Sequence, residues 1–209
     1  AETTYHEALA LDPASLRANR AIAGFFIRAG KLKEAEAPLR RVAESARSAD
    51  DWYALCDYYI ATRRKPQALG ILENLRQQPA TYVDATVKIA FLATLDHQPL
   101  EAMRMVNEVI AKVPNSGEAL ALKVHLLLGA RKRLEALSVA QEAVRADPKS
   151  EAAHFAHAVA EAANLQREAA KNAFIEVLKL NPGSAEATME LTQLYLDQNL
   201  VDTAMQYAE

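Results

Sequence analysis

The sequence predicts an all-α solenoid of tandem helix-turn-helix repeats, and three observations lead to this fold class. An alanine recurs every 33 or 34 residues, at Ala35, Ala68, Ala102, Ala136, Ala170 and Ala204. A turn proline keeps the same period at Pro114, Pro148 and Pro182. The composition, 51% hydrophobic with only 6 glycines in 209 residues, favours helices over sheets. A period near 34 is typical of helical repeats that bury their apolar faces against their neighbours.

The expected helices begin and end at recognisable residues. Ser15 can cap a first helix that ends near Ala29, and Gly30 can then adopt the left-handed conformation that closes it. Second helices carry proline in their first turn, where it is tolerated, at Pro66 and Pro99. The other expected caps are aspartate or serine residues, at Asp50 or Asp51, Ser150 and Ser184.

These signals divide the chain into repeats of one solenoid over residues 1–209. Residues 1–13 form a half repeat, and the last, truncated repeat is 183–209. The complete repeats between them are 14–48, 49–79, 80–114, 115–148 and 149–182. Because both ends interrupt a repeat, we expect the chain to be a fragment of a larger protein.

The recurring alanines predict where the two helices of each repeat approach closely. Small residues on the first helices should face them, at Ala23, Cys56, Ala90 and Ala158. Cys56 is then a small buried hydrophobe, and a single cysteine excludes an intramolecular disulfide. Bulkier residues should fill the layer between neighbouring pairs, at Leu39, Leu72, Val106 and Phe174.

Several segments resemble the tetratricopeptide repeat: Gly30-Lys-Leu-Lys-Glu-Ala35, and the turns Leu-Asp-Pro13, Ala-Asp-Pro148 and Leu-Asn-Pro182. The resemblance covers essentially the whole chain. It implies a right-handed α-α superhelix whose first helices line a concave groove. It also implies a non-enzymatic scaffold that binds a protein or peptide partner without a cofactor.

Projected onto this chain, the family geometry places twelve residues in that groove. They are Arg17, Arg20, Tyr53, Asp57, Val87, Phe91, His125, Leu128, Phe155, Val159, Met189 and Gln193. The strip has an arginine end, an aromatic and aliphatic middle and an acidic rim, which suits an amphipathic helix or an extended peptide. The alternative is that Phe155 and Val159 only help first helices pack. Lys171 is expected to be a solvated charge on the convex face.

Other functions find little support in the residues. Co-chaperones of this family need a carboxylate clamp, but the matching positions hold Arg20, Gly24, Ala54, Asp84 and Lys88. The net charge of −3 offers no basic excess for nucleic acid. No apolar run long enough for membrane insertion occurs, and the compartment stays open between the cytoplasm and the bacterial periplasm or envelope.

One cluster has the spacing of a metal site. His154, His157 and Glu161 could share a helical face, but the repeat register puts them where the first helix packs on the second. We therefore expect a hydrogen-bonded polar seam, no metal, and no catalytic residues.

Two settings for a scaffold remain. Alanine-rich arrays of this texture loosely resemble those of bacterial exopolysaccharide-export and secretion lipoproteins. The alternative is a regulatory or substrate-recruiting array of an enzyme, such as a glycosyltransferase, whose catalytic domain lies outside this chain.

Overall fold

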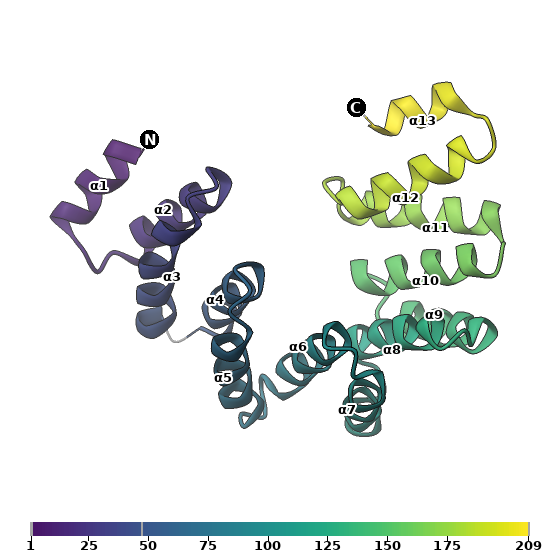
Figure 1. The fold of residues 1–209 in the computed structure, drawn as a ribbon, viewed down its shortest axis with the longest axis horizontal. Coiled ribbons are helices and arrows are strands. Elements are labelled where there is room, and N and C mark those ends of the chain that lie inside the picture. Colours follow the sequence, from purple (N-terminus) through teal and green to yellow (C-terminus); the bar gives the residue numbers. More distant parts are fainter. Residues whose placement is uncertain (1, 47, 209) are drawn as a thin grey trace. The chain divides into compact units, whose positions relative to one another are not determined.

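The computed structural model describes residues 2–46 and 48–208, which contain thirteen α-helices and no strand (Figure 1). The first six are α1 (Glu2–Leu11), α2 (Leu16–Arg28), α3 (Leu32–Ala46), α4 (Ala49–Ala61), α5 (Lys65–Arg76) and α6 (Tyr82–Leu95). The next four are α7 (Pro99–Lys112), α8 (Gly117–Gly129), α9 (Arg133–Ala146) and α10 (Glu151–Ala163). The last three are α11 (Arg167–Leu180), α12 (Ala185–Leu196) and α13 (Val201–Ala208).

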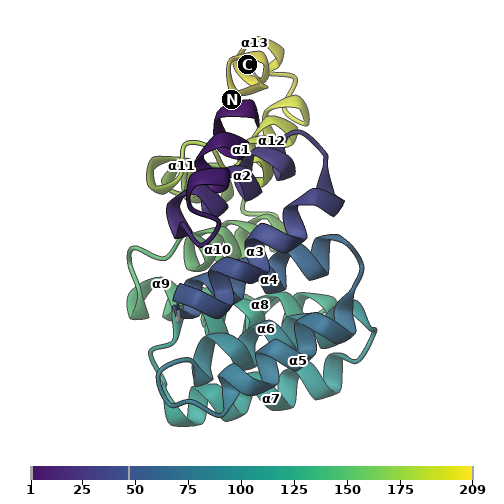
Figure 2. The same ribbon diagram turned by 90° about the vertical axis from the view of Figure 1, so that its left-hand side faces the viewer.

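The chain forms two compact units, residues 1–85 and 86–209, here called unit 1 and unit 2. In unit 1, α3 packs against both α2 and α4, and α4 packs against α5; Figure 2 shows these helices following one another in chain order. In unit 2, α10 packs against α8, α9 and α11, and α12 packs against α11 and α13. Neighbours in sequence therefore pack against each other from α1 to α5 and from α7 to α13, and the all-α fold of tandem helix-turn-helix repeats is confirmed. The right-handed superhelix stays a prediction.

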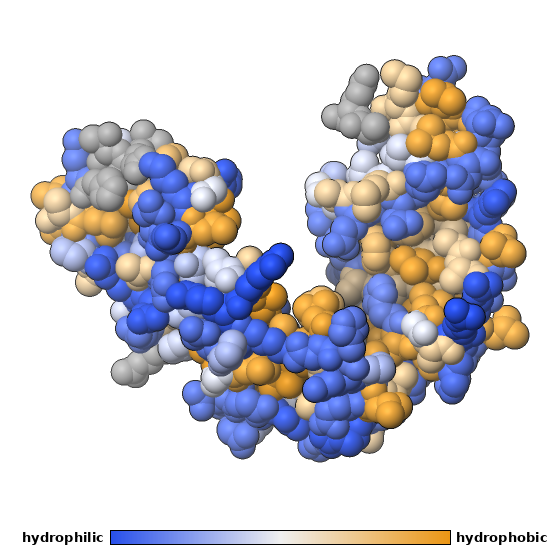
Figure 3. All heavy atoms as spheres, in the orientation of Figure 1, coloured by the Kyte–Doolittle hydropathy of each residue, from blue (hydrophilic) through white to orange (hydrophobic). Residues whose placement is uncertain are grey.

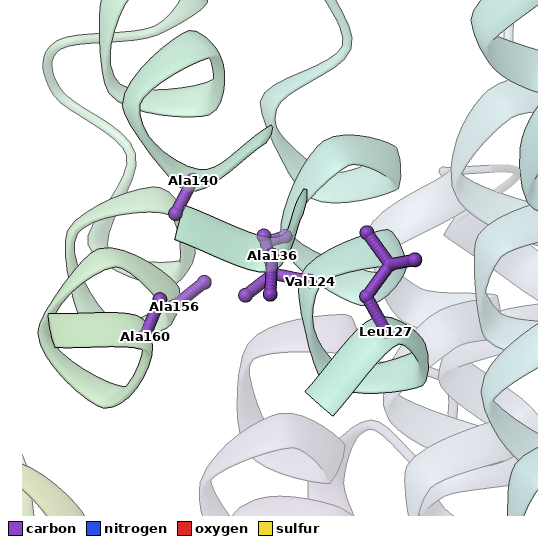
Figure 4. Packing of buried hydrophobic residues seen from close by; sticks show 7 residues of the cluster. Val124, Leu127, Ala136, Ala140, Ala156 and Ala160 are labelled. Carbon is purple, nitrogen blue, oxygen red and sulfur yellow. The ribbon is translucent and has the colours of Figure 1, made fainter. Parts of the chain in front are cut away.

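The recurring alanines lie where the helices of a pair meet. All six are at most 1% exposed, and the small residues expected opposite them, Ala23, Cys56, Ala90 and Ala158, are equally buried. Ala136 is packed among Val124 and Leu127 of α8, Ala140 of α9, and Ala156 of α10 (Figure 4). Because interiors are close-packed, the small side chain sets the helix separation at this point. The Sγ atom of Cys56 lies 3.8 Å from the Ala68 carbonyl oxygen, inside the same kind of contact.

The helix starts agree with the sequence in part. The Oγ atoms of Ser15 and Ser150 accept hydrogen bonds from the backbone N–H groups of Ala18 and Ala153, at 3.4 and 3.2 Å. Ser184 occupies the equivalent position before α12, but its side chain makes no capping hydrogen bond. The expectation for that bond was wrong.

The cap expected at Asp50 or Asp51 was also wrong, because α4 begins at Ala49, before either aspartate. Ser48 holds the cap position, again without a side-chain bond, and both aspartates lie in the first turn. Acidic side chains are favoured there by the partial positive charge of a helix N-terminus. Asp51 also accepts two hydrogen bonds from Arg20, so its carboxylate is engaged with that side chain.

A left-handed residue ends the first helix of every complete repeat. Gly30 does so with φ of 71°, as predicted. The equivalent residues in later repeats are not glycine, and their φ values are 58 to 62°: Arg63, His97, Arg131, Leu165 and Asn199. After Arg131, the N–H of Lys132 donates to the Leu127 carbonyl at 2.9 Å, a bond that satisfies a carbonyl at the helix end. This repeated turn was not visible in the sequence because only one member is a glycine.

Among the described residues, no helix is both long enough and apolar enough to cross a membrane. Pro66 and Pro99 stand in the first turns of α5 and α7, as expected.

Candidate functional site: an open groove in unit 2

An open groove of about 1520 Å³ runs along unit 2, and every residue that lines it belongs to that unit. We call it the unit 2 groove. Three successive first helices, α6, α8 and α10, supply most of its wall, and the starts of α7 and α12 complete it. Its apolar lining includes Val87, Phe91, Leu100, Met103, Leu122 and Phe155. In Figure 3 hydrophobic and hydrophilic side chains alternate on the face of unit 2 that the view shows.

The two phenylalanines of the groove differ in how much of each side chain the rest of the chain covers. Phe91 on α6 leaves 47% of its surface exposed, so its ring is presented to the groove and not enclosed in the core. Phe155 on α10 is half-buried and meets the fully buried Phe174 of α11 edge to face, with ring centroids 5.7 Å apart. Such pairs fix ring orientation. Phe155 is therefore a groove residue and a packing residue at once.

His125 on α8 lies beside Phe155, with ring centroids 6.5 Å apart and the planes inclined by only 29°. The His125 side chain is exposed to water on one side, and the groove walls remove part of its solvent. This burial lowers the pKa of His125, and the Glu186 carboxylate only partly offsets it. The ring is therefore neutral near pH 7 and adds an uncharged, flat surface to the groove.

Carboxylates gather where α8, α10 and α12 begin. Glu118, Asp147, Glu151 and Glu186 all line the groove. Glu151 is held in place by Asn181, whose Nδ2 atom donates to both carboxylate oxygens at 3.0 and 3.1 Å. The Oδ1 atom of Asp147 accepts the Lys149 backbone N–H at 3.1 Å. The groove thus has one acidic edge beside an apolar floor.

Two lysines also line the groove, Lys88 on α6 and Lys132 before α9. The Nζ atom of Lys132 lies 3.1 Å from the Glu135 carboxylate. The lysine therefore forms an ion pair with a residue in the first turn of α9.

Four of the residues predicted for a concave groove come together here: Val87, Phe91, His125 and Phe155. The other four predicted residues of unit 2 do not line it. Leu128 and Val159 are partly buried against the hydrophobic clusters of their repeats, Met189 is 65% exposed, and Gln193 donates to Asp197 at 2.7 Å.

In unit 1, two of the four predicted residues are engaged in contacts between helices. Arg20 on α2 forms a two-point ion pair with Asp51 on α4, at 2.7 and 2.9 Å. The Tyr53 hydroxyl donates to the Thr81 carbonyl at 3.3 Å. Arg17 and Asp57 are exposed.

The prediction missed Leu122, Leu100 and Met103. One signal could have found Leu122: residues 121, 122 and 125 share a helical face, so the selection of His125 should have included the residues one turn before it. Leu100 and Met103 belong to a second helix, which the projected geometry left out.

The histidine pair of α10 is divided between two partners. His154 makes a 3.0 Å hydrogen bond with the Pro148 carbonyl, and the Nε2 atom of His157 lies 3.2 Å from the buried Glu161 carboxylate. The three side chains are thus a polar seam within one helix and its preceding turn. Among the described residues, no group of three metal-ligating side chains is arranged around a common point.

Lys171 is not the solvated convex charge that the sequence suggested. Its side chain is only 10% exposed, and its Nζ atom lies 2.8 Å from Glu168 and 2.9 Å from the Gln198 amide oxygen. The ammonium group also stands 5.1 Å from the centre of the Tyr195 ring. The expectation was wrong because α11 packs against the next helix pair, which covers the lysine stem.

Two family models match the chain. One, described as ChAPs (Chs5p-Arf1p-binding proteins), matches residues 52–181, more than half of the sequence. The other, described as a tetratricopeptide repeat, matches residues 155–209. The chain belongs to the ChAPs family, and its repeats are tetratricopeptide repeats. The sequence reasoning had found the repeat but not the ChAPs description. No curated protein matches the chain.

Solved structures show the same fold at low identity. The APC/C hetero-tetramer Cut9-Hcn1 matches with a TM-score of 0.68 and 13% identity, covering 97% of this chain and 41% of that one. The MamA RS-1 ArsTM double mutant matches with a TM-score of 0.53 and 18% identity, over 75% and 88% of the two chains. The first repeat domain of Spaghetti (RPAP3), bound to the HSP90 peptide SRMEEVD, has a TM-score of 0.51 and 20% identity, over 56% and 93%.

Proposed function

We propose that this chain is a non-enzymatic scaffold whose unit 2 groove binds a segment of a partner protein. The observation that carries the proposal is the groove itself, about 1520 Å³ of open space with apolar side chains presented to it. Phe91 and Leu100, at 47% and 87% exposure, remain largely uncovered by the chain's own residues. Covering them with a partner removes apolar surface from water, at roughly 25 cal/mol per Å².

The comparisons support binding in general terms. The ChAPs description is that of proteins that bind other proteins, and a structure of the same fold holds a peptide. From these we carry over only protein binding, and neither the named partners nor their peptides. Bacterial export and secretion assemblies, whose repeat arrays this sequence loosely resembles, are the first source of natural partners to examine.

The groove geometry says which residues should matter. Aromatic side chains that become fully covered usually contribute most of the binding free energy, whereas exposed charges contribute little. Phe91 and Phe155 are the aromatic candidates. Lys179 on α11 is a suitable control, because its side chain is 63% exposed and pairs with Glu176 of its own helix.

The test begins with selection of phage-displayed random peptides on the intact chain. Affinities of the selected peptides are then measured by titration calorimetry for the wild type and for Phe91→Ala, Phe155→Ala and Lys179→Ala. We expect each phenylalanine variant to bind about tenfold more weakly, and Lys179→Ala to bind as the wild type does. Circular dichroism establishes that each variant is folded.

Two outcomes would overturn the proposal. One is that no peptide is selected on the folded chain. The other is that selected peptides bind Phe91→Ala and Phe155→Ala as tightly as the wild type.

A further inference from the structure

We propose that the segment bound in the unit 2 groove is a basic amphipathic helix, with arginine or lysine residues beside its apolar anchors. This inference rests on the proposed function and specifies the chemistry of the partner. It follows from three features of the groove: its acidic edge, the exposed faces of its aromatic rings and its dimensions.

Three of the groove carboxylates have no lysine or arginine partner in the part of the chain that the structure describes. Among the described residues, no lysine or arginine forms an ion pair with Asp147, Glu151 or Glu186. Several acidic residues on the second helices are different, since Glu101 pairs with Arg104 and Glu176 with Lys179, each at 2.6 Å. The acidic edge of the groove therefore keeps negative charge that ion pairs neutralise at these other sites.

A structural role accounts for only part of this acidity. Carboxylates near the starts of α8, α10 and α12 favour these helices, because each helix N-terminus carries roughly half a positive charge. Three such termini offset only about half of the charge on Asp147, Glu151 and Glu186. Lys88 also lines the groove, and Lys132 is paired with Glu135. A negative excess remains at this edge, so a cationic partner complements it.

The floor beside this edge suits a cation on an apolar stem. Phe91 and Phe155 present ring surface to the groove. An arginine guanidinium or a lysine ammonium binds favourably over such a ring and can reach a carboxylate at the same time. The molecule already uses this contact, since Arg64 lies 4.5 Å from the Tyr59 ring centre while it pairs with Glu36.

The dimensions fit a short helix. A helix of 10 to 12 Å diameter that rises 1.5 Å per residue would place roughly ten residues in the 1520 Å³ groove. Helices α8 and α10 pack against each other. Packed helices are separated by about 8 to 10 Å, close to the roughly 10 Å between residues i and i+7 of a partner helix. Anchors one heptad apart can therefore meet α8 and α10 in turn, with basic residues along the flank that faces the acidic edge.

The experiment analyses the composition of the selected peptides and the charge dependence of their binding. We expect selection on the wild type to enrich arginine or lysine at helical spacing from leucine or aromatic residues. Glu151→Gln and Glu186→Gln should each weaken the selected peptides about fivefold. Raising the ionic strength from about 0.05 M to about 0.5 M should weaken the wild type more than either variant.

The control is Glu142→Gln, which removes an exposed carboxylate of α9 outside the groove and should leave affinity unchanged. Glutamine at position 151 retains an acceptor for Asn181, and thermal melts establish folding. Peptides that bind through Phe91 but carry acidic or uncharged flanks would overturn this inference while the proposed function stands. Failure to select any peptide would remove both.

Discussion

The first helices of the two units use the same repeat positions differently. In unit 1, Arg20 and Tyr53 reach across to Asp51 and Thr81 and connect neighbouring helices. In unit 2, the positions equivalent to Arg20 and Tyr53 by the alanine period hold Val87, Ala121 and Phe155, which line an open groove. The backbone geometry is shared, so the residue type decides the outcome. The polar ends of Arg20 and Tyr53 find partners within the chain, whereas an apolar side chain at the same position stays available to a partner.

The largest effect separates core aromatics from groove aromatics within unit 2. Phe174→Ala should lower the free energy of unfolding by roughly 3 to 5 kcal/mol, because the ring is fully buried. Phe91→Ala should cost less than about 1 kcal/mol, since nearly half of that ring is already in water. Denaturant unfolding of the two variants measures the difference. Equal losses would mean that Phe91 belongs to the core and that the groove is misassigned.

The second test asks whether the two units share one packing rule beneath their different surfaces. Ala68→Leu in unit 1 and Ala136→Leu in unit 2 should each destabilise by roughly 1 to 3 kcal/mol, because both alanines are fully buried between helices. Ala111→Leu, at an exposed position of α7, is the control and should change little. If either buried variant has the same melting temperature as the control, the repeat register of that unit is wrong.

A third test compares cations that cover tyrosine rings. Arg64 lies over Tyr59 in unit 1, and Lys171 lies over Tyr195 in unit 2. Lys171→Ala should destabilise by about 1 kcal/mol through lost ring contact and lost packing of its stem. Lys179→Ala, on the same helix but well exposed, should have no measurable effect. Thermal melts that rank these two lysines in the opposite order would contradict the buried position of Lys171.

The smallest effect concerns pH and is specific to unit 2. Burial lowers the pKa of His125 from its ordinary value of 6.5 in the folded state, whereas the unfolded chain titrates normally. As the pH falls through that ordinary value, the unfolded state takes up a proton first, so stability declines. Glu186, Glu118 and Glu151 also line this part of the groove and temper the change. His125→Gln should flatten the decline between pH 7.5 and about 5.5, as measured by urea unfolding. Parallel curves would contradict a lowered pKa for His125.

The sequence predicted the helical repeat well, because one small residue per repeat is enough to reveal the register. Ala136 and its equivalents must be small where two helices touch, so the same residue type recurs at each of these positions. The left-handed turn at Leu165 or Arg131 could not be predicted from the sequence, because leucine and arginine disfavour this backbone conformation and only the fold imposes it.

The groove was only partly predictable. Phe91 and Phe155 followed from the position of first helices, but Leu100 comes from a second helix and needs the three-dimensional arrangement. Lys171 was misjudged for the same reason, because a lysine looks solvated in a sequence until a neighbouring repeat covers its stem. Local patterns predict what one repeat does, and contacts between repeats decide the rest.

Hydrogen–deuterium exchange with and without a selected peptide tests the contrast between the units most directly. If unit 2 holds the binding groove, bound peptide should slow amide exchange in α8 and α10 and leave α2 and α4 unchanged. The Phe91→Ala variant, mixed with the same peptide, should show no slowing at concentrations that protect the wild type. Protection concentrated in α2 and α4, with α8 and α10 unaffected, would contradict the assignment of binding to the unit 2 groove.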